Sequence, residues 1–151
     1  MRPPKIRAIV LALAALAPPL SACDRSPSMT QPSDGLNLAG MWTGSASDSS
    51  GPGDMSWQLT QTGASFSGTL TMTDAASGSH GRGSVSGTVS GPAVRFTMTV
   101  PAGGFDDPWT ACSADVSGNA QATSSSITAA YSGSNSCTGT IASGQLTLNR
   151  Q

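Results

Sequence analysis

Residues 94–100 read Val94-Arg95-Phe96-Thr97-Met98-Thr99-Val100, and this stretch decides the fold class. Large apolar side chains alternate with polar ones at every step, which is typical of a β-strand with one dry face and one solvated face. The same alternation recurs in seven other stretches, at 42–44, 55–59, 66–72, 85–89, 112–118, 127–133 and 141–148. Eight such strands joined by local connections predict an all-β domain, an eight-stranded antiparallel up-and-down β-barrel that closes on itself.

Short turns between these stretches predict how neighbouring strands pair. Two-residue turns at 63–64, 91–92 and 124–125 would place Leu59 opposite Gly68, Gly87 opposite Phe96, and Gly118 opposite Tyr131. Each pair sets a glycine against a large inward side chain, as the packing of a narrow barrel requires. In the last strand Ile141 and Leu146 are out of phase, so we expect a bulge at 143–144.

The remaining connections gather at the opposite end of the predicted barrel. They run through 48–54, 74–83, 101–108 and 134–136, and most are longer than the turns. Functional residues are concentrated on loops held by a rigid scaffold, so this end is the expected working surface.

Two cysteines, Cys112 and Cys137, fall within the predicted barrel. The turn at 124–125 places them opposite each other on adjacent strands. Two cysteines in an exported chain most simply form one disulfide, which would fasten the rim on the loop side.

The chain after position 22 has an unusual charge composition. It holds four arginines against eight aspartates, a net charge of −4, and contains neither lysine nor glutamate. Nucleic-acid partners need clustered positive charge, so this class of partner is excluded. The missing residues are also good helix formers, which favours β-structure.

The N-terminus has the features of an export signal. Arg2, Lys5 and Arg7 precede an apolar run at 8–16, which is too short to span a bilayer. The run leads into Leu20-Ser21-Ala22-Cys23, which resembles the lipobox of bacterial lipoproteins. That resemblance implies cleavage before Cys23, lipidation of its thiol, and stable anchoring in a membrane of the cell envelope. The alternative is a soluble secreted protein.

This reading divides the chain into three parts. Residues 1–22 form the lipoprotein signal peptide, 23–38 the lipidated cysteine with a Pro/Ser-rich linker, and 39–151 the barrel domain. The expected location is the periplasmic side of the inner or outer membrane, or the cell surface.

The barrel's opening segment carries a second resemblance. Leu38-Ala39-Gly40-Met41-Trp42-Thr43-Gly44 resembles the Gly-x-Trp opening of lipocalin-like and avidin-like barrels. From there to Gln151 the chain is similar to small bacterial lipoproteins that carry such a barrel. The resemblance implies the fold; 43–46 departs from the polar residues that hold biotin in avidin-like proteins, so no ligand is carried over.

An aromatic set is the candidate ligand site inside the barrel: Trp42, Trp57, Phe66, Phe96, Trp109 and Tyr131. Eight-stranded barrels stand at the size where side chains either fill the interior or leave room for one small ligand. The number of apolar inward residues favours a filled interior, which would move binding to the loop rim.

The sequence gives weaker support to a catalytic site, a calcium site or a copper site. Ser79, His80 and Asp74 lie on one Gly/Ser-rich loop without a nucleophile motif, and Asp106-Asp107 offers too few oxygens for calcium. Four methionines could bind copper, but at alternating positions core packing is the commoner role: Met41, Met55, Met72 and Met98. We therefore expect no catalytic residues, no metal and no cofactor.

The expected function is a non-catalytic, membrane-tethered binding or interaction module that uses the long loops at the end distant from the membrane. Two alternatives remain: a carrier of small hydrophobic ligands that uses the barrel interior, and a small-barrel protease inhibitor. The partner would be an envelope protein or a small hydrophobic molecule.

Overall fold

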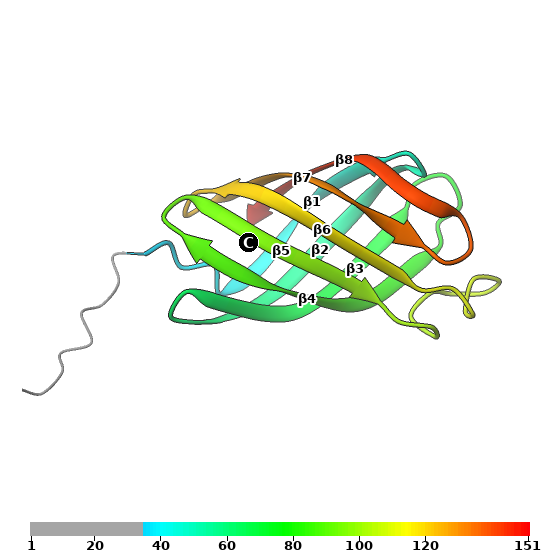
Figure 1. Ribbon diagram of the computed structural model, residues 1–151, viewed down its shortest axis with the longest axis horizontal. Coiled ribbons are helices and arrows are strands. Elements are labelled where there is room, and N and C mark those ends of the chain that lie inside the picture. The colour runs from blue at the N-terminus through cyan, green and yellow to red at the C-terminus, as the bar shows by residue number, and fades with distance from the viewer. Residues whose placement is uncertain (1–34) are drawn as a thin grey trace, which may run out of the picture. The chain divides into compact units, whose positions relative to one another are not determined.

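The computed structural model describes residues 35–151, and these form a closed antiparallel barrel of eight strands (Figure 1). The predicted signal peptide, Cys23 and most of the predicted linker lie outside the described residues. Each strand pairs with its neighbours in sequence, and the first pairs with the last. The strands are β1 (Gly40–Asp48), β2 (Gly51–Thr62), β3 (Ser65–Asp74), β4 (His80–Ser90), β5 (Ala93–Val100), β6 (Ala114–Ala122), β7 (Ser126–Asn135) and β8 (Gly139–Arg150).

The predicted pairing of the strands is confirmed. Leu59 lies opposite Gly68, Gly87 opposite Phe96, and Gly118 opposite Tyr131. The expected bulge is present in β8, where Tyr131 faces Gly144 but Gly133 faces Ile141. Ser143 takes up the extra residue with a φ of 58°, a left-handed conformation that few non-glycine residues adopt.

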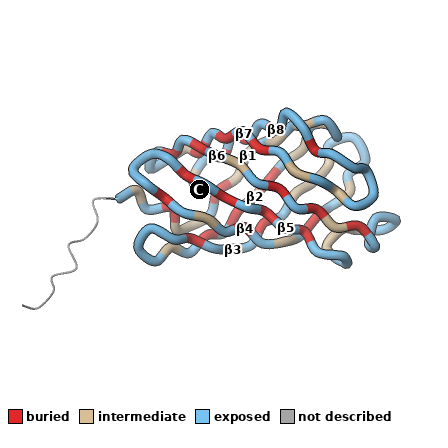
Figure 2. Tube along the Cα trace, viewed as in Figure 1, coloured by how far each residue is buried: buried red, intermediate tan, exposed pale blue. Residues whose placement is uncertain are grey.

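Burial alternates along most of the strand residues as the sequence pattern requires, with an interruption at the bulge of β8 (Figure 2). In β5 the inward residues Val94, Phe96, Met98 and Val100 are buried, and the residues between them are exposed. The polar outer face is nearly all serine, threonine and other uncharged residues. The interior is therefore the only core of the described residues.

One end of the barrel, which we call the turn end, carries the connections at 63–64, 91–92 and 123–125. Leu38, assigned to the linker from the sequence, is fully buried there and belongs to the core. The Leu38 backbone is held on both sides: its N–H donates to Gln61 Oε1 at 2.7 Å, and its carbonyl accepts from Trp42 Nε1 at 2.8 Å. Arg150 stacks on the Trp42 ring at 4.4 Å. The segment before β1 thus closes this end.

The opposite end, which we call the loop end, carries the connections at 49–50, 75–79, 101–113 and 136–138 (at right in Figure 1). The first was expected to be a loop over 48–54, which is wrong. Strand pairing continues to Asp48 opposite Gly51, because Gly51 adopts a φ of 133° and leaves only Ser49 and Ser50 in the turn. The long loop is 101–113, since β6 begins at Ala114 and not at Cys112.

The predicted disulfide between Cys112 and Cys137 is confirmed, with a Cα–Cα distance of 5.6 Å. It joins the end of the 101–113 loop to the connection between β7 and β8. The backbone N–H of Ser136 donates to the Ser113 carbonyl, and the backbone N–H of Ser113 donates to Ser136 Oγ. Residues 35–151 contain no helix of a length and apolarity that could cross a membrane.

Candidate functional site: a cavity at the loop end

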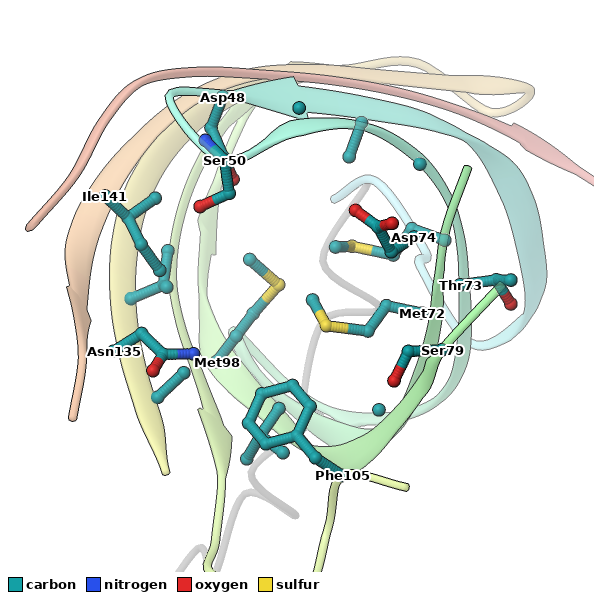
Figure 3. A pocket seen from close by; sticks show the side chains of 18 of the residues that line it. Asp48, Ser50, Met72, Thr73, Asp74, Ser79, Met98, Phe105, Asn135 and Ile141 are labelled. Atoms are coloured by element: carbon teal, nitrogen blue, oxygen red, sulfur yellow. The ribbon is translucent and has the colours of Figure 1, made fainter. Parts of the chain in front are cut away.

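The interior of the barrel is filled at the turn end and hollow at the loop end. A cavity of about 390 Å³ opens between the four connections of the loop end (Figure 3). This volume lies at the lower end of the range for small-molecule sites. The expectation of a filled interior is therefore wrong for this half of the barrel. Two inward positions of β4 at this end, Gly81 and Gly83, contribute no side chains, and Met72 and Phe105 cover the Gly81 position.

An aromatic layer separates the cavity from the packed turn end. The Trp57 and Phe96 rings meet edge to face, with centroids 5.2 Å apart. Trp57 lies one inward position from Met55 toward the turn end, and Phe96 lies one inward position from Met98 in the same direction. Since Met55 and Met98 line the cavity, the two rings form the layer beneath it.

The cavity wall is largely apolar. Its deeper part is built from aliphatic, thioether and aromatic side chains: Met55, Leu70, Met72, Met98, Val100 and Phe105. Phe105 comes from the 101–113 loop and approaches Gly81, with which it forms an isolated backbone bridge. A Cβ added at Gly81 would lie 2.8 Å from the Met72 side chain and 3.0 Å from Phe105. This glycine thus makes room for both side chains.

The mouth of the cavity is acidic. The inward-phase residues Asp48 and Asp74 line it, and no lysine, arginine or histidine does so among the described residues. Asp48 accepts a hydrogen bond of 2.9 Å from the Tyr131 hydroxyl of β7, whose ring lies over Gly144 of the intervening strand β8. Burial, and then this bond, raise the pKa of Tyr131 above its usual value, so the phenol stays neutral.

Asp74 is kept ionised by its own loop. It accepts hydrogen bonds from the Ser77 hydroxyl at 2.7 Å and the Ser77 backbone N–H at 2.6 Å. The bond from the hydroxyl, followed by the bond from the backbone, holds the pKa of Asp74 below its usual value. The cavity mouth therefore presents fixed negative charge at neutral pH.

Ser79 supplies a polar group on the cavity wall (Figure 3). Its Oγ is buried and has no hydrogen-bond partner among the described residues, and the same holds for Trp57 Nε1 beneath the cavity. Buried polar atoms in proteins are nearly always hydrogen-bonded. Ser79 Oγ is thus available to a polar group of a bound molecule.

The structure divides the six aromatic residues predicted to bind a ligand. Tyr131 and Trp109 line the cavity, with Trp109 on the 101–113 loop and 45% exposed. The other four, Trp42, Trp57, Phe66 and Phe96, are buried in the filled part of the barrel and do not line the cavity. Of these four, Trp57 and Phe96 form the layer beneath the cavity.

Three methionines line the cavity, a role that was not predicted for them from the sequence. Met55, Met72 and Met98 fit the alternating core pattern equally well, so the sequence favoured a packing role for them. The signal that separates them from ordinary core residues is their place at the loop-end half of β2, β3 and β5. The sequence gives this place only after the strand registers are known.

The residues considered for catalysis and for calcium binding do not assemble into a site. His80 Nδ1 lies 2.9 Å from Asp106 Oδ2 and is not paired with Asp74, which bonds Ser77. Asp106 also accepts from Arg82 at 3.3 Å, and the bond with His80 is the main cause that lowers the pKa of Asp106. Across residues 35–151, no group of three or more His, Cys, Asp or Glu side chains could hold a metal ion.

A second hollow lies on the outer face of β4 to β7. It is lined by polar residues such as Ser86, Thr97 and Arg95, over the positions of Gly87 and Gly118. Its lining is mostly short polar side chains and glycine, with Arg95, Phe96 and Tyr131. This surface is more polar than the wall of the cavity.

No protein-family model matches the chain, and no match is found among curated proteins.

Proposed function

We propose that this protein is a non-catalytic binding protein of the cell envelope that holds a small hydrophobic ligand in the cavity at the loop end. The observation that carries the proposal is the combination of a cavity of about 390 Å³ with an apolar wall of Met55, Leu70, Met98 and Val100. Sites for small molecules are concave and mostly apolar, with a few polar groups that fix orientation. This favours the barrel interior over the loops as the primary binding surface.

The polar groups around the mouth define the kind of ligand. Ser79 Oγ is free to exchange a hydrogen bond, while Tyr131 is already bonded to Asp48. The carboxylates of Asp48 and Asp74 disfavour an anionic head group. The proposed ligand has an apolar body and a neutral or positively charged polar end.

Membrane attachment comes from the sequence and completes the proposal. Lipidated Cys23 would join the barrel through the linker, and β1 starts at the turn end. A tether at the turn end would leave the loop end facing away from the membrane. This arrangement suits a lipoprotein of the lipocalin-like kind that receives its ligand from the surrounding medium.

Protein recognition by the loops is the second candidate function. It is favoured by Trp109, which is 45% exposed on the 101–113 loop. Tryptophan is enriched among the residues that dominate protein interfaces. In this case the ligand of the protein would be an envelope protein that contacts the rim.

A cavity-filling variant separates the two functions. Ala114 is buried and lines the cavity, so Ala114→Phe would occupy ligand space, whereas Ala130→Phe adds the same ring on the outer face of β7. Titration with N-phenyl-1-naphthylamine, a neutral apolar fluorophore, should show saturable binding to the wild type and to Ala130→Phe. Ala114→Phe should lose most of the binding.

The proposal fails if the wild type does not bind the fluorophore, or if Ala114→Phe binds it as tightly as Ala130→Phe does. Circular dichroism and the melting temperature of both variants show that the barrel is intact. The loop hypothesis predicts another result: Trp109→Ala would abolish capture of an envelope protein, and Ala114→Phe would leave that capture unchanged.

A further inference from the structure

Three methionines meet in the cavity, and this goes beyond what an apolar pocket requires. The chain has six methionines, of which Met41, Met55, Met72 and Met98 fall in the described residues. Met41 lies on the outer face of β1 and is 47% exposed. The three others all line the cavity. Every inward methionine of the described barrel is therefore in one place.

The strand pairing brings the thioethers together. Met55 on β2 lies directly opposite Met72 on β3, which sets their Cβ atoms roughly 5 Å apart. Met98 comes from β5, on the other side of β4. On β4 the residue opposite Met72 is Gly81 and the residue opposite Met98 is Val85, and the inward position between these two is Gly83. Figure 3 shows Met72 and Met98 pointing into the lumen toward one another.

The side chains can adjust to a shared partner. Methionine is unbranched, with three rotatable bonds beyond the Cα atom, and its sulfur is polarizable. The Met72 sulfur would lie 2.9 Å from a Cβ at Gly81, so Met72 leans over that glycine toward the lumen. The cavity leaves the methionine ends free to move, because its volume is not filled by other side chains.

The charges around the methionines favour a cation. Asp48 and Asp74 line the mouth, and no basic side chain of the described residues does so. Carboxylates at the mouth attract positive charge and lower the cost of holding it in an apolar cavity. Thioethers themselves are neutral and bind soft cations, above all monovalent copper, in preference to hard ions such as Ca²⁺ or Mg²⁺.

We propose that Met55, Met72 and Met98 form a binding site for a soft monovalent cation, Cu⁺ or Ag⁺, with the three sulfurs as ligands. The aspartates at the mouth guide the ion in and do not ligate it. The site takes the ion without a change in its oxidation state. The proposal does not depend on a hydrophobic ligand, although the two would compete for the same space.

The test measures Ag⁺ binding by calorimetry, because Ag⁺ needs no reductant. The full chain is used with Cys23→Ser throughout, which removes the one thiol outside the disulfide. The expected result is one Ag⁺ per chain in the cavity. Loss of a residue that only orients a metal ligand commonly lowers metal affinity by about tenfold or more, and loss of a ligand itself should lower it at least as much. Met72→Leu and Met98→Leu should therefore each weaken Ag⁺ binding by about tenfold or more.

Met41→Leu is the matched control, since it removes an exposed thioether from the same barrel. This variant should leave the affinity for Ag⁺ unchanged. A parallel titration of the wild type with Zn²⁺ should show no comparable binding. A competition titration of Cu⁺ against bicinchoninate under ascorbate should reproduce the order of the variants. Leucine replaces methionine with little change in volume, so the barrel should stay folded.

A second measurement needs no variant of the cavity. With methyl-labelled methionine, Ag⁺ should shift the ε-methyl resonances of Met55, Met72 and Met98 and leave that of Met41 in place. The proposal is overturned if these three resonances stay fixed, or if Met72→Leu and Met98→Leu bind Ag⁺ as tightly as the wild type. If these samples fail to bind Ag⁺ but still bind the fluorophore, the cation site is refuted and the apolar-ligand proposal is unaffected.

Discussion

Breaking the Cys112–Cys137 disulfide gives the most quantitative prediction about stability. The two cysteines are 25 residues apart, and the loop they close contains β6, its turn and β7. In the chain-entropy account, closing a loop of this length removes about 3.5 kcal/mol of conformational entropy from the unfolded chain at 25 °C. The disulfide should therefore raise the free energy of unfolding by about this amount.

The expected effect on melting follows from the size of the barrel. Unfolding entropies of about 2.1 cal/mol/K per residue, over a domain of about 115 residues, turn 3.5 kcal/mol into a fall of about 10–15 °C in melting temperature. The Cys112→Ala/Cys137→Ala variant should show this fall by differential scanning calorimetry. The wild type with its disulfide reduced should show it too.

The reduced wild type is the control that isolates the covalent link, because it keeps both cysteine side chains. Cys112 is only 3% exposed, so the alanine variant also loses some buried apolar surface and should melt slightly lower still. If the oxidised and reduced proteins melt within about 2 °C of each other, the entropic reasoning is wrong for this loop.

Three further predictions concern the interior and the anchor. The protein has a single tyrosine, and its pKa is raised by burial and by the bond to Asp48, so absorbance at 295 nm should show no phenolate at pH 10 in the folded state. Because the pKa of Tyr131 is higher in the folded than in the unfolded state, Tyr131 contributes stability that is complete below about pH 10 and is lost as the pH rises further. Tyr131→Phe should flatten this loss of stability at alkaline pH, and an unchanged loss would contradict the raised pKa of Tyr131. Gly118→Ala would set a methyl group 2.4 Å from the Phe96 ring, which should lower the free energy of unfolding by about 1–3 kcal/mol in urea titrations, and a neutral result would mean that the ring moves aside freely. Cys23→Ser should abolish incorporation of a labelled fatty acid and release the protein from membranes; incorporation that persists would refute the lipobox reading.

The fold could be predicted because its determinants are local. In β5 the alternation from Val94 to Val100 fixes which side chains face inward, and the turn at 91–92 then fixes the pairing of Gly87 with Phe96. The bulge in β8 was visible from the phase change between Ile141 and Leu146. Such patterns give topology, because a shift of one residue would turn the whole apolar set outward.

The cavity could not be predicted in the same way. Trp57 and Met55 occupy equivalent positions in the pattern, yet one packs beneath the cavity and the other lines it. The difference depends on what each meets across the barrel: Phe96 packs against Trp57, whereas Met55 borders the open lumen. Counting apolar side chains therefore predicted a filled interior.

The most direct test of the central claim, that the loop-end cavity is the binding site, is a crystal structure of the protein with N-phenyl-1-naphthylamine. Density for the fluorophore should lie inside the barrel between Met72, Met98 and Phe105, above Trp57. Density confined to the outer hollow beside Arg95 and Gly118 would contradict the claim.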